Sequence, residues 1–280
     1  MRVNIANLGL PQFFDRKSDI IYGLFHALSS LGYETSVSQN SVNAKDLNLI
    51  IGSDIAASDE GAVQQISKHT DYIIYEVENF NGNTINYRNQ FNLSNYQTLL
   101  SGAKFVITPY FYNVKTLQSF LAKEKIVYAR WGFHDRMISS NISRDNNFQY
   151  DALFFGLIKG SRLEKYKSLV EHFGEKIKVL TENDPFTTRD YCVSRSRFGL
   201  SLSYGETDNF VNPFRIYYMV ANRMPVLSDH NADDDNYQDI CTKLSFNALL
   251  KEVVSAKQDP THLEEQCRQN CLMHNLRGII

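Results

Sequence analysis

Short apolar runs alternate with amphipathic stretches along the first half of the chain. The apolar, β-branched runs predict strands at 2–6, 33–38, 47–52, 71–77, 104–108 and 126–129. Stretches whose apolar residues recur every three or four positions predict helices at 18–31, 95–101 and 113–122. Ser18 suits the N-cap of the first helix and Gly32 its stop. Strands that alternate with helices in this way predict a parallel sheet with helices on both faces.

The alternation lapses into a polar stretch at 137–149 and then restarts. In the second half we expect strands at 152–156, 176–180, 198–203 and 226–228, with helices at 161–173, 187–196 and 213–222. From Asp234 onward the pattern is helical throughout, and such a tail is able to brace the first domain. The sequence therefore predicts an α/β fold with two Rossmann-like domains, 1–137 and 138–280, the second ending in a helical C-terminal tail.

The composition agrees with a folded chain of two modest domains. Of 280 residues, 43% are hydrophobic and 21% are charged, which excludes a disordered or fibrous protein. The net charge of -2 argues against a nucleic-acid scaffold. Because no apolar run approaches the roughly 20 residues of a membrane helix, and because the chain opens on a strand pattern rather than a secretory signal, we expect a cytoplasmic protein without a membrane span.

The cysteines lack the Cys-x-x-Cys spacing of zinc and redox motifs, which fits free thiols in a reducing compartment. They are Cys192, Cys241, Cys267 and Cys271. Cys267, Cys271 and His274 fall at i, i+4 and i+7 of the last predicted helix, a spacing that suits zinc. Leu263 continues the same stripe, so a seam facing the core is the better interpretation. No metal is expected.

The segment 198–229 carries the clearest chemistry. A strand and a polar loop lead to a helix in which Asn212 suits the N-cap and Pro213 the first helical position. The free backbone N–H groups of such a helix start bind phosphate, and Arg215 adds a full positive charge for a diphosphate. The alternative is a surface arginine in an ordinary strand–helix unit.

A second edge of the same kind follows the strand at 152–156. Gly156 lets a ligand approach the backbone, and Lys159 and Arg162 supply positive charge. The alternative is a plain strand–helix turn. If these two strands are neighbours, both edges face one crevice of the kind that binds nucleotide diphosphates.

The stretch Val220-Ala-Asn-Arg-Met-Pro-Val-Leu227 resembles the turn that follows the donor-site helix of GT-B glycosyltransferases, with Arg223 in place of the family's glycine. Four further pieces are similar to bacterial and viral members in the same order: Ile74-Tyr-Glu-Val-Glu-Asn79, Tyr110-Phe-Tyr-Asn-Val114, Trp131-Gly-Phe-His134 and Asp151-Ala-Leu-Phe-Phe-Gly156. Many retaining members carry two glutamates with seven residues between them. These are absent here, because Phe210 and Tyr218 stand at the matching positions, so the resemblance leaves retention and inversion open.

The resemblance implies a GT-B fold, with two Rossmann-like domains facing across a cleft. It implies a nucleotide-sugar donor, most simply a UDP-sugar, on 151–229 and an oligosaccharide or glycan acceptor on 1–135. No cofactor or metal is expected, because Arg215 and the helix start would do the electrostatic work. The predicted donor-binding residues are Gly156, Lys159, Arg162, Tyr204, Asn212, Phe214 and Arg215.

Candidates for acid–base chemistry come from the first domain. Glu78 ends a predicted strand, where α/β sheets place their ligands, and it matches a carboxylate position in the similar family. His134 ends the last strand of that domain and titrates near neutral pH. Asp15 lies in the loop after the first strand. For each of the three, the alternative is a hydrogen-bonded loop anchor.

Other features leave further alternatives open. The run 233–235 is Asp-Asp-Asp, which chelates a metal–nucleotide if it ends a strand and otherwise favours a helix start. An asparagine-rich segment at 79–95 is either a solvated loop or a sugar-binding one. A glycan cleft would gather Tyr110, Tyr112, Trp131 and Tyr204. A sugar-nucleotide epimerase or hydrolase, or a non-catalytic two-domain binding protein, would use the same fold.

Overall fold

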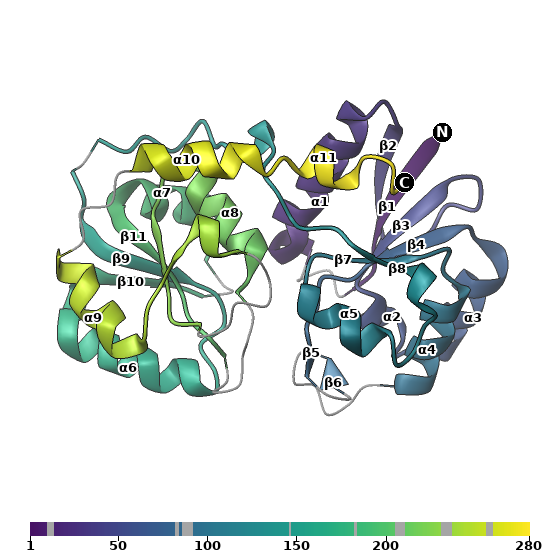
Figure 1. Ribbon diagram of the computed structural model, residues 1–280, viewed down its shortest axis with the longest axis horizontal. Helices are drawn as coiled ribbons and strands as arrows, with labels where there is room; N and C mark the ends of the chain where they lie inside the picture. The colour runs from purple at the N-terminus through teal and green to yellow at the C-terminus, as the bar shows by residue number, and fades with distance from the viewer. Residues whose placement is uncertain are drawn as a thin grey trace. The chain divides into compact units, whose positions relative to one another are not determined.

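The computed structural model describes residues 1–9, 14–81, 84–85, 92–145, 147–181, 184–204, 211–230, 237–255 and 260–280. These residues form two compact units (Figure 1). Unit 1 comprises Met1–Trp131 and Leu272–Ile280, and unit 2 comprises Gly132–Cys271. Each unit holds a parallel sheet with helices on both faces, so the predicted α/β fold with two Rossmann-like sheets is confirmed.

Unit 1 is built on a six-stranded parallel sheet in the order β2-β1-β3-β4-β7-β8. Its strands are β1 (Arg2–Asn7), β2 (Glu34–Gln39), β3 (Leu47–Ile51), β4 (Tyr72–Tyr75), β7 (Val106–Thr108) and β8 (Ile126–Tyr128). A separate antiparallel hairpin pairs β5 (Phe80–Asn81) with β6 (Thr84–Ile85). The chain passes from β1 to β2 on one side and reaches β3 on the other, so the topological switch point of this sheet lies between β1 and β3.

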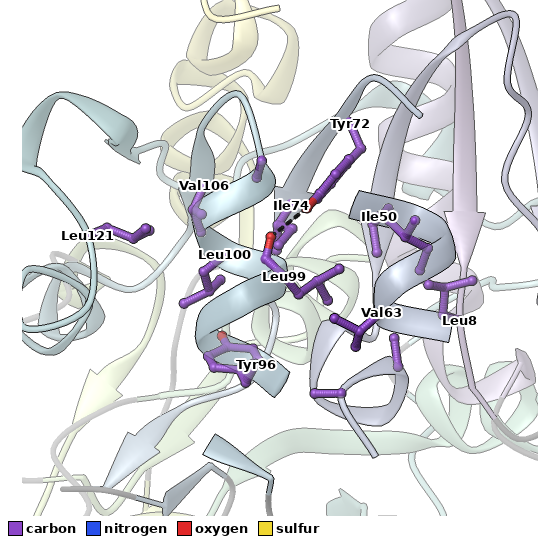
Figure 2. Close-up of a cluster of buried hydrophobic side chains, with 14 of the residues drawn as sticks. Leu8, Ile50, Val63, Tyr72, Ile74, Tyr96, Leu99, Leu100, Val106 and Leu121 are labelled. Carbon is purple, nitrogen blue, oxygen red and sulfur yellow. Dashed lines mark hydrogen bonds between the residues drawn. The ribbon is translucent and has the colours of Figure 1, made fainter. Parts of the chain in front are cut away.

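Helices cover both faces of this sheet (Figure 1). They are α1 (Phe14–Ser30), α2 (Ser53–Ala56), α3 (Glu60–His69), α4 (Leu93–Gly102), α5 (Phe111–Leu117) and α11 (Leu272–Leu276), with the 3₁₀ turn η2 (Lys123–Lys125). Helix α11, near the C-terminus, packs against α1. Figure 2 shows the core under α3 and α4, where Val63, Ile74 and Leu99 are buried and the hydroxyl of Tyr72 donates to the carbonyl oxygen of Leu99 at 2.7 Å.

The first helix is longer than predicted. It begins at Phe14, so Ser18 lies inside the helix and is not its N-cap. The prediction placed the start at the first good capping residue, but the preceding residues contain no helix breaker and continue the turn. Gly32 follows the helix with a φ of 90°, as expected of a helix stop.

Unit 2 is built on a five-stranded parallel sheet in the order β10-β9-β11-β12-β13. Its strands are β9 (Tyr150–Phe155), β10 (Ile177–Leu180), β11 (Ser196–Ser201), β12 (Val226–Ser228) and β13 (Thr242–Lys243). Its helices are α6 (Ser161–Phe173), α7 (Phe186–Arg195), α8 (Pro213–Ala221), α9 (Phe246–Ser255) and α10 (Pro260–Gln269), with 3₁₀ turns η3 (Asp135–Met137), η4 (Gly174–Lys176) and η5 (Gln238–Ile240). Helices α6 and α9 cover one face, and α7, α8 and α10 cover the other (Figure 1). The switch point lies between β9 and β11.

Two features of unit 2 differ from the simple sequence pattern. The tail is not wholly helical, because Thr242 and Lys243 pair with β12 and extend the sheet, whose edge backbone groups would otherwise stay open. The polar stretch 137–149 is bonded to unit 2: the backbone N–H of Ser139 donates to Asn222 Oδ1 at 2.8 Å, and Arg144 donates to the carbonyl oxygen of Val193 at 2.8 Å. No helix among the described residues is long and apolar enough to cross a membrane.

Candidate functional site

The carboxyl edge of the unit 2 sheet collects most of the residues predicted to bind a donor. Strand β9 ends at Phe155 and is followed by Gly156, and the neighbouring β11 ends at Ser201 and is followed by Leu202 and Tyr204. Because these strands flank the switch point, the helices that follow them, α6 (Ser161–Phe173) and α8 (Pro213–Ala221), lie on opposite faces of the sheet, the arrangement at which α/β folds bind ligands.

Gly156 and Arg215 lie against each other at this edge. Gly156 has a φ of 144°, and a Cβ added there would lie 2.5 Å from Nη2 of Arg215. The guanidinium carbon of Arg215 lies 5.2 Å from the ring centroid of Phe154 and 5.5 Å from that of Phe155. The first turn of α8 thus holds a cation over the end of β9, where a Cβ at position 156 would meet the guanidinium as it lies.

The start of α8 is capped as predicted. Asn212 Oδ1 accepts from the backbone N–H of Arg215 at 3.0 Å, and Pro213 occupies the first turn. Phe214 is buried and anchors this turn in unit 2. Its ring therefore supports the site by packing rather than by lining an open surface.

Arg162, a residue of α6, contacts the segment that follows β11. Its Nε donates to the carbonyl oxygen of Leu202 at 2.8 Å, and its guanidinium carbon lies 5.2 Å from the ring centroid of Tyr204. Burial lowers the pKa of Arg162 to about 10, so the side chain stays charged at neutral pH. Ser161 Oγ donates to the carbonyl oxygen of Tyr204 at 2.7 Å. Of the three cations predicted at this edge, Lys159 is exposed, whereas Arg162 and Arg215 are partly buried.

The sequence interpretation missed an acidic residue after β12. Asp229 is buried, accepts from the backbone N–H of Ser203 at 2.6 Å, and pairs with Lys165 Nζ at 2.5 Å. Asp229 directly follows a strand, so the rule that selected Glu78 would have found it. Lys165 lies one helical turn after Arg162, which puts both cations on one face of α6.

His230 is a second residue at this edge that the sequence interpretation did not single out. The shift in its pKa reflects the positive charges around it. His230 is buried, and its Nδ1 lies 2.9 Å from Ser228 Oγ. Burial, followed by the charges of four cations, lowers the pKa of His230 to about 3, so the ring is neutral at pH 7. The four cations are Arg162, Lys165, Arg215 and Lys243. A net positive field at a carboxyl edge is suited to a ligand with several negative charges.

In unit 1, Glu78 lies just beyond the end of β4. Its Oε1 is 3.9 Å from Lys17 Nζ, which comes from α1, and both side chains are largely buried, with exposed fractions of 16% and 12%. The neighbouring Glu76 was not singled out by sequence. It is fully buried, and burial together with the charge of Asp54 raises the pKa of Glu76 to about 7.

The other two acid–base candidates are placed differently from the prediction. His134 does not end a strand, because β8 stops at Tyr128. It belongs to unit 2, where it caps η3, and its Nδ1 accepts from the backbone N–H of Arg136 at 3.1 Å. Asp15 lies in the first turn of α1 rather than in a loop, and its side chain is outside the described residues. The extended helix and the early end of β8 account for both differences.

The structure places the residues of two clusters that the sequence raised. Tyr110 and Trp131 are buried core residues, and Tyr75 stacks edge-on against Trp131 with ring centroids 6.3 Å apart, so the four aromatics do not gather at a surface. Cys267 lies in α10 and His274 in α11, with Cys271 between the two helices, so these residues do not share a helical face. Among the described side chains, no group of three or more His, Cys, Asp or Glu is placed to hold a metal ion. The acidic run at 233–235 and much of the asparagine-rich segment lie outside the described residues.

Gly156→Ala is expected to destabilise unit 2 by about 2 kcal/mol, because the new Cβ meets the Arg215 guanidinium and the φ of Gly156 is strained for alanine. Urea unfolding measures the change. In an Arg215→Ala background the contact is gone, so the same substitution should cost about 1 kcal/mol less. If Gly156→Ala lowers the free energy of unfolding equally in both backgrounds, the position of the Arg215 guanidinium does not require a glycine at 156.

No protein-family model and no curated protein sequence matches the chain. Solved structures match nearly all of it. An apo-form lipopolysaccharide outer core galactosyltransferase, WaaB, is 8% identical with a TM-score of 0.55, over 99% of this chain and 98% of that one. A putative UDP-N-acetylglucosamine 2-epimerase from Listeria monocytogenes is 10% identical with a TM-score of 0.52, over 99% and 94%.

A third similar structure is the pneumococcal O-GlcNAc transferase GtfA in complex with UDP and GlcNAc. It is 11% identical with a TM-score of 0.52, over 90% of this chain and 57% of that one. Sequence identities this low establish architecture and not reaction. The two parallel α/β sheets and these matches show that the chain has a GT-B-like fold.

Proposed function

We propose that this protein is a glycosyltransferase that moves a sugar from a nucleotide-sugar, most simply a UDP-sugar, to a hydroxyl of a glycan. The fold is shared with a galactosyltransferase and with an O-GlcNAc transferase that was solved with UDP. The cations at the carboxyl edge of unit 2 match the charge of a diphosphate. The donor is therefore assigned to unit 2, within residues 151–229.

The observation that carries the proposal is the contact of Arg215 with Gly156 at the switch point. A guanidinium held over a residue without a side chain can approach both the backbone and a bound phosphate. As the bond from the sugar to the diphosphate breaks, negative charge grows on the leaving oxygen. Arg215 and the capped start of α8 would stabilise that charge without help from a metal.

The acceptor is assigned to residues 1–135, with Glu78 as its base. Glu78 accepts the proton of an acceptor hydroxyl while the oxygen bonds to the anomeric carbon. The bond from that carbon to the phosphate oxygen breaks, and its electron pair leaves with the nucleoside diphosphate. This sequence of events inverts the anomeric configuration. His134 and Asp15 remain predictions, and neither is used in this scheme.

A thermal-shift screen tests donor binding directly. A nucleotide sugar at a hundred times its dissociation constant should stabilise unit 2 by about 2.7 kcal/mol, because it binds only the folded state. The screen compares UDP-, GDP-, CMP- and dTDP-sugars, with free galactose as the control that lacks a diphosphate. We expect a shift with the UDP-sugars and none with galactose. The absence of a shift with every nucleotide sugar would contradict the proposal.

A sugar-nucleotide epimerase or hydrolase is the second candidate, and the structural similarity to a putative 2-epimerase favours it. Such an enzyme needs the donor site but no glycan. Incubation of the protein with UDP-N-acetylglucosamine alone separates the two functions. Conversion to an epimer, or release of the free sugar at the same rate with and without glycans, would favour this candidate over transfer.

A further inference from the structure

The buried carboxyl group of Glu76 is held from three sides. Its Oε2 accepts from the hydroxyls of Ser53, at 2.7 Å, and of Tyr96, which come from α2 and α4. Its Oε1 accepts from the backbone N–H of Glu78 at 2.9 Å. With an exposed fraction of 1%, Glu76 is too deep to touch a substrate, so any role in the reaction must act through another residue.

The residue that Glu76 holds is Glu78. Asn113 in α5 holds the other side of the same segment: its Nδ2 donates to the carbonyl oxygen of Glu78 at 2.8 Å, and its Oδ1 accepts from the backbone N–H of Phe80 at 3.2 Å. The Glu78 peptide groups are therefore fixed at both ends, while its side chain reaches the edge of the sheet beside Lys17. Backbone bonds of this kind restrict where a carboxylate can point.

A glutamine at position 76 would keep the bond from Glu78 but reverse the other two, so the hydroxyl protons of Ser53 and Tyr96 would need other acceptors. Its amide oxygen would accept from the backbone N–H of Glu78, and its amide nitrogen would donate to Ser53 Oγ and the Tyr96 hydroxyl, since hydroxyl groups can turn to accept. A buried carboxyl group is destabilised by desolvation once it ionises, and a glutamine is not. The carboxyl group is therefore the group that accepts all three bonds at once, although burial disfavours its charged form.

We infer that Glu76 is a positioning residue that fixes the backbone of Glu78 and, when charged, strengthens Glu78 as the base for the acceptor hydroxyl. This inference rests on the proposed function. The groups that face Glu76 are Asp54 and Ser53 from α2, Tyr96 from α4 and Glu78 from the following loop. Lys17 Nζ lies 3.9 Å from Glu78 Oε1, and a negative charge on Glu76 would act on Glu78 in the sense opposite to that cation.

The test compares Glu76→Gln, Glu76→Ala and Glu78→Gln, with Glu60→Gln as a matched control on the exposed start of α3. UDP release from UDP-galactose, UDP-glucose and UDP-N-acetylglucosamine is measured with and without a glycan panel. The wild-type pH profile of kcat/KM should show a step near pH 7, where Glu76 ionises. Glu76→Gln should keep most of the turnover but lose that step. Glu76→Ala should lower kcat at least about tenfold with the KM for the UDP-sugar unchanged, because the base is misplaced while the donor site is intact.

Thermal melting gives a second readout. The folded-state pKa of Glu76 lies above its unfolded value, so the stability present below the unfolded value is lost as the pH rises through about 7. The melting temperature of Glu76→Gln relative to that of the wild type should therefore be higher at pH 8 than at pH 4.5. If Glu76→Ala does not fold, the pH profile of Glu76→Gln decides alone.

The possible failures are distinguishable. An unchanged pH profile in Glu76→Gln, with Glu78→Gln inactive, would overturn the inference and leave the proposed base in place. Full activity in Glu78→Gln would overturn the base assignment, and the inference with it. No UDP release from any donor, with or without glycans, would overturn the proposed function itself.

Discussion

Arg215→Ala should lower turnover of the UDP-sugar by about two orders of magnitude, the scale of losing one charge partner in a transition state. The reason is the position of the guanidinium, which packs against Gly156 and over the rings of Phe154 and Phe155 at the switch point of unit 2. The KM should rise less than kcat falls, because charge on the leaving diphosphate grows only as the bond breaks. Steady-state UDP release measures both constants.

Arg197→Ala is the matched control. Arg197 also lies over an aromatic ring, with its guanidinium carbon 5.2 Å from the Phe198 centroid, but it stands at the start of β11, at the opposite edge of the same sheet. Its loss removes a similar cation–π contact without touching the carboxyl edge, so turnover should be unchanged. Wild-type turnover in a folded Arg215→Ala protein would show that Arg215 takes no part in the reaction. An equal fall in both variants would point to lost stability rather than lost chemistry.

The strand–helix alternation was enough to predict both sheets. Runs such as Leu47–Ile51 and Val226–Ser228 are short and mostly apolar, and they proved to be strands at nearly the predicted positions. The short strand β13 could not be predicted in this way. Thr242 and Lys243 have no apolar periodicity, and only the open edge of β12 makes them a strand.

The local geometry at the carboxyl edge of unit 2 was predictable because its signals are local. A capping asparagine, a proline at the first turn and a glycine after a strand each have a backbone reason that sequence shows directly. Arg223 is a further case: it stands where the similar family has glycine, and it adopts a φ of 61°, so the turn keeps its left-handed geometry with a less suitable residue.

The unit 1 network was less predictable, because its parts are far apart in sequence. Glu76 and Glu78 look alike in a strand-end motif, and only the contacts from Ser53 and Tyr96 show that one is buried and the other reaches the edge. The placement of Trp131 could not be predicted for the same reason. Its place in the core depends on Tyr75, which is a neighbour in space and not in the chain.

Gly52→Ala should destabilise unit 1 by about 3 to 5 kcal/mol. Losses of this size arise from few mechanisms, of which a steric clash is one. Gly52 joins β3 to α2 at a φ of 88°, and a Cβ there would lie 2.0 Å from the carbonyl oxygen of Leu8 and 3.1 Å from Lys17 Nζ. The carbonyl is not free to move aside, because the backbone N–H of Leu8 donates to the carbonyl oxygen of Ile51 at 2.8 Å. The substitution must therefore open the β1–β3 edge or distort the turn.

Urea unfolding followed by Trp131 fluorescence measures this loss, because the chain's single tryptophan is buried in unit 1. Gly32→Ala is the matched control: its φ of 90° is nearly the same, but no atom lies within 4 Å of the added Cβ, so it should cost only about 1 kcal/mol of backbone strain. The difference between the two variants isolates the steric clash. Similar costs at both glycines would show that the β1–β3 edge relaxes around the new methyl group. In that case Lys17 would not be held rigidly beside Glu78, and the base proposed there would lack the fixed surroundings that its function requires.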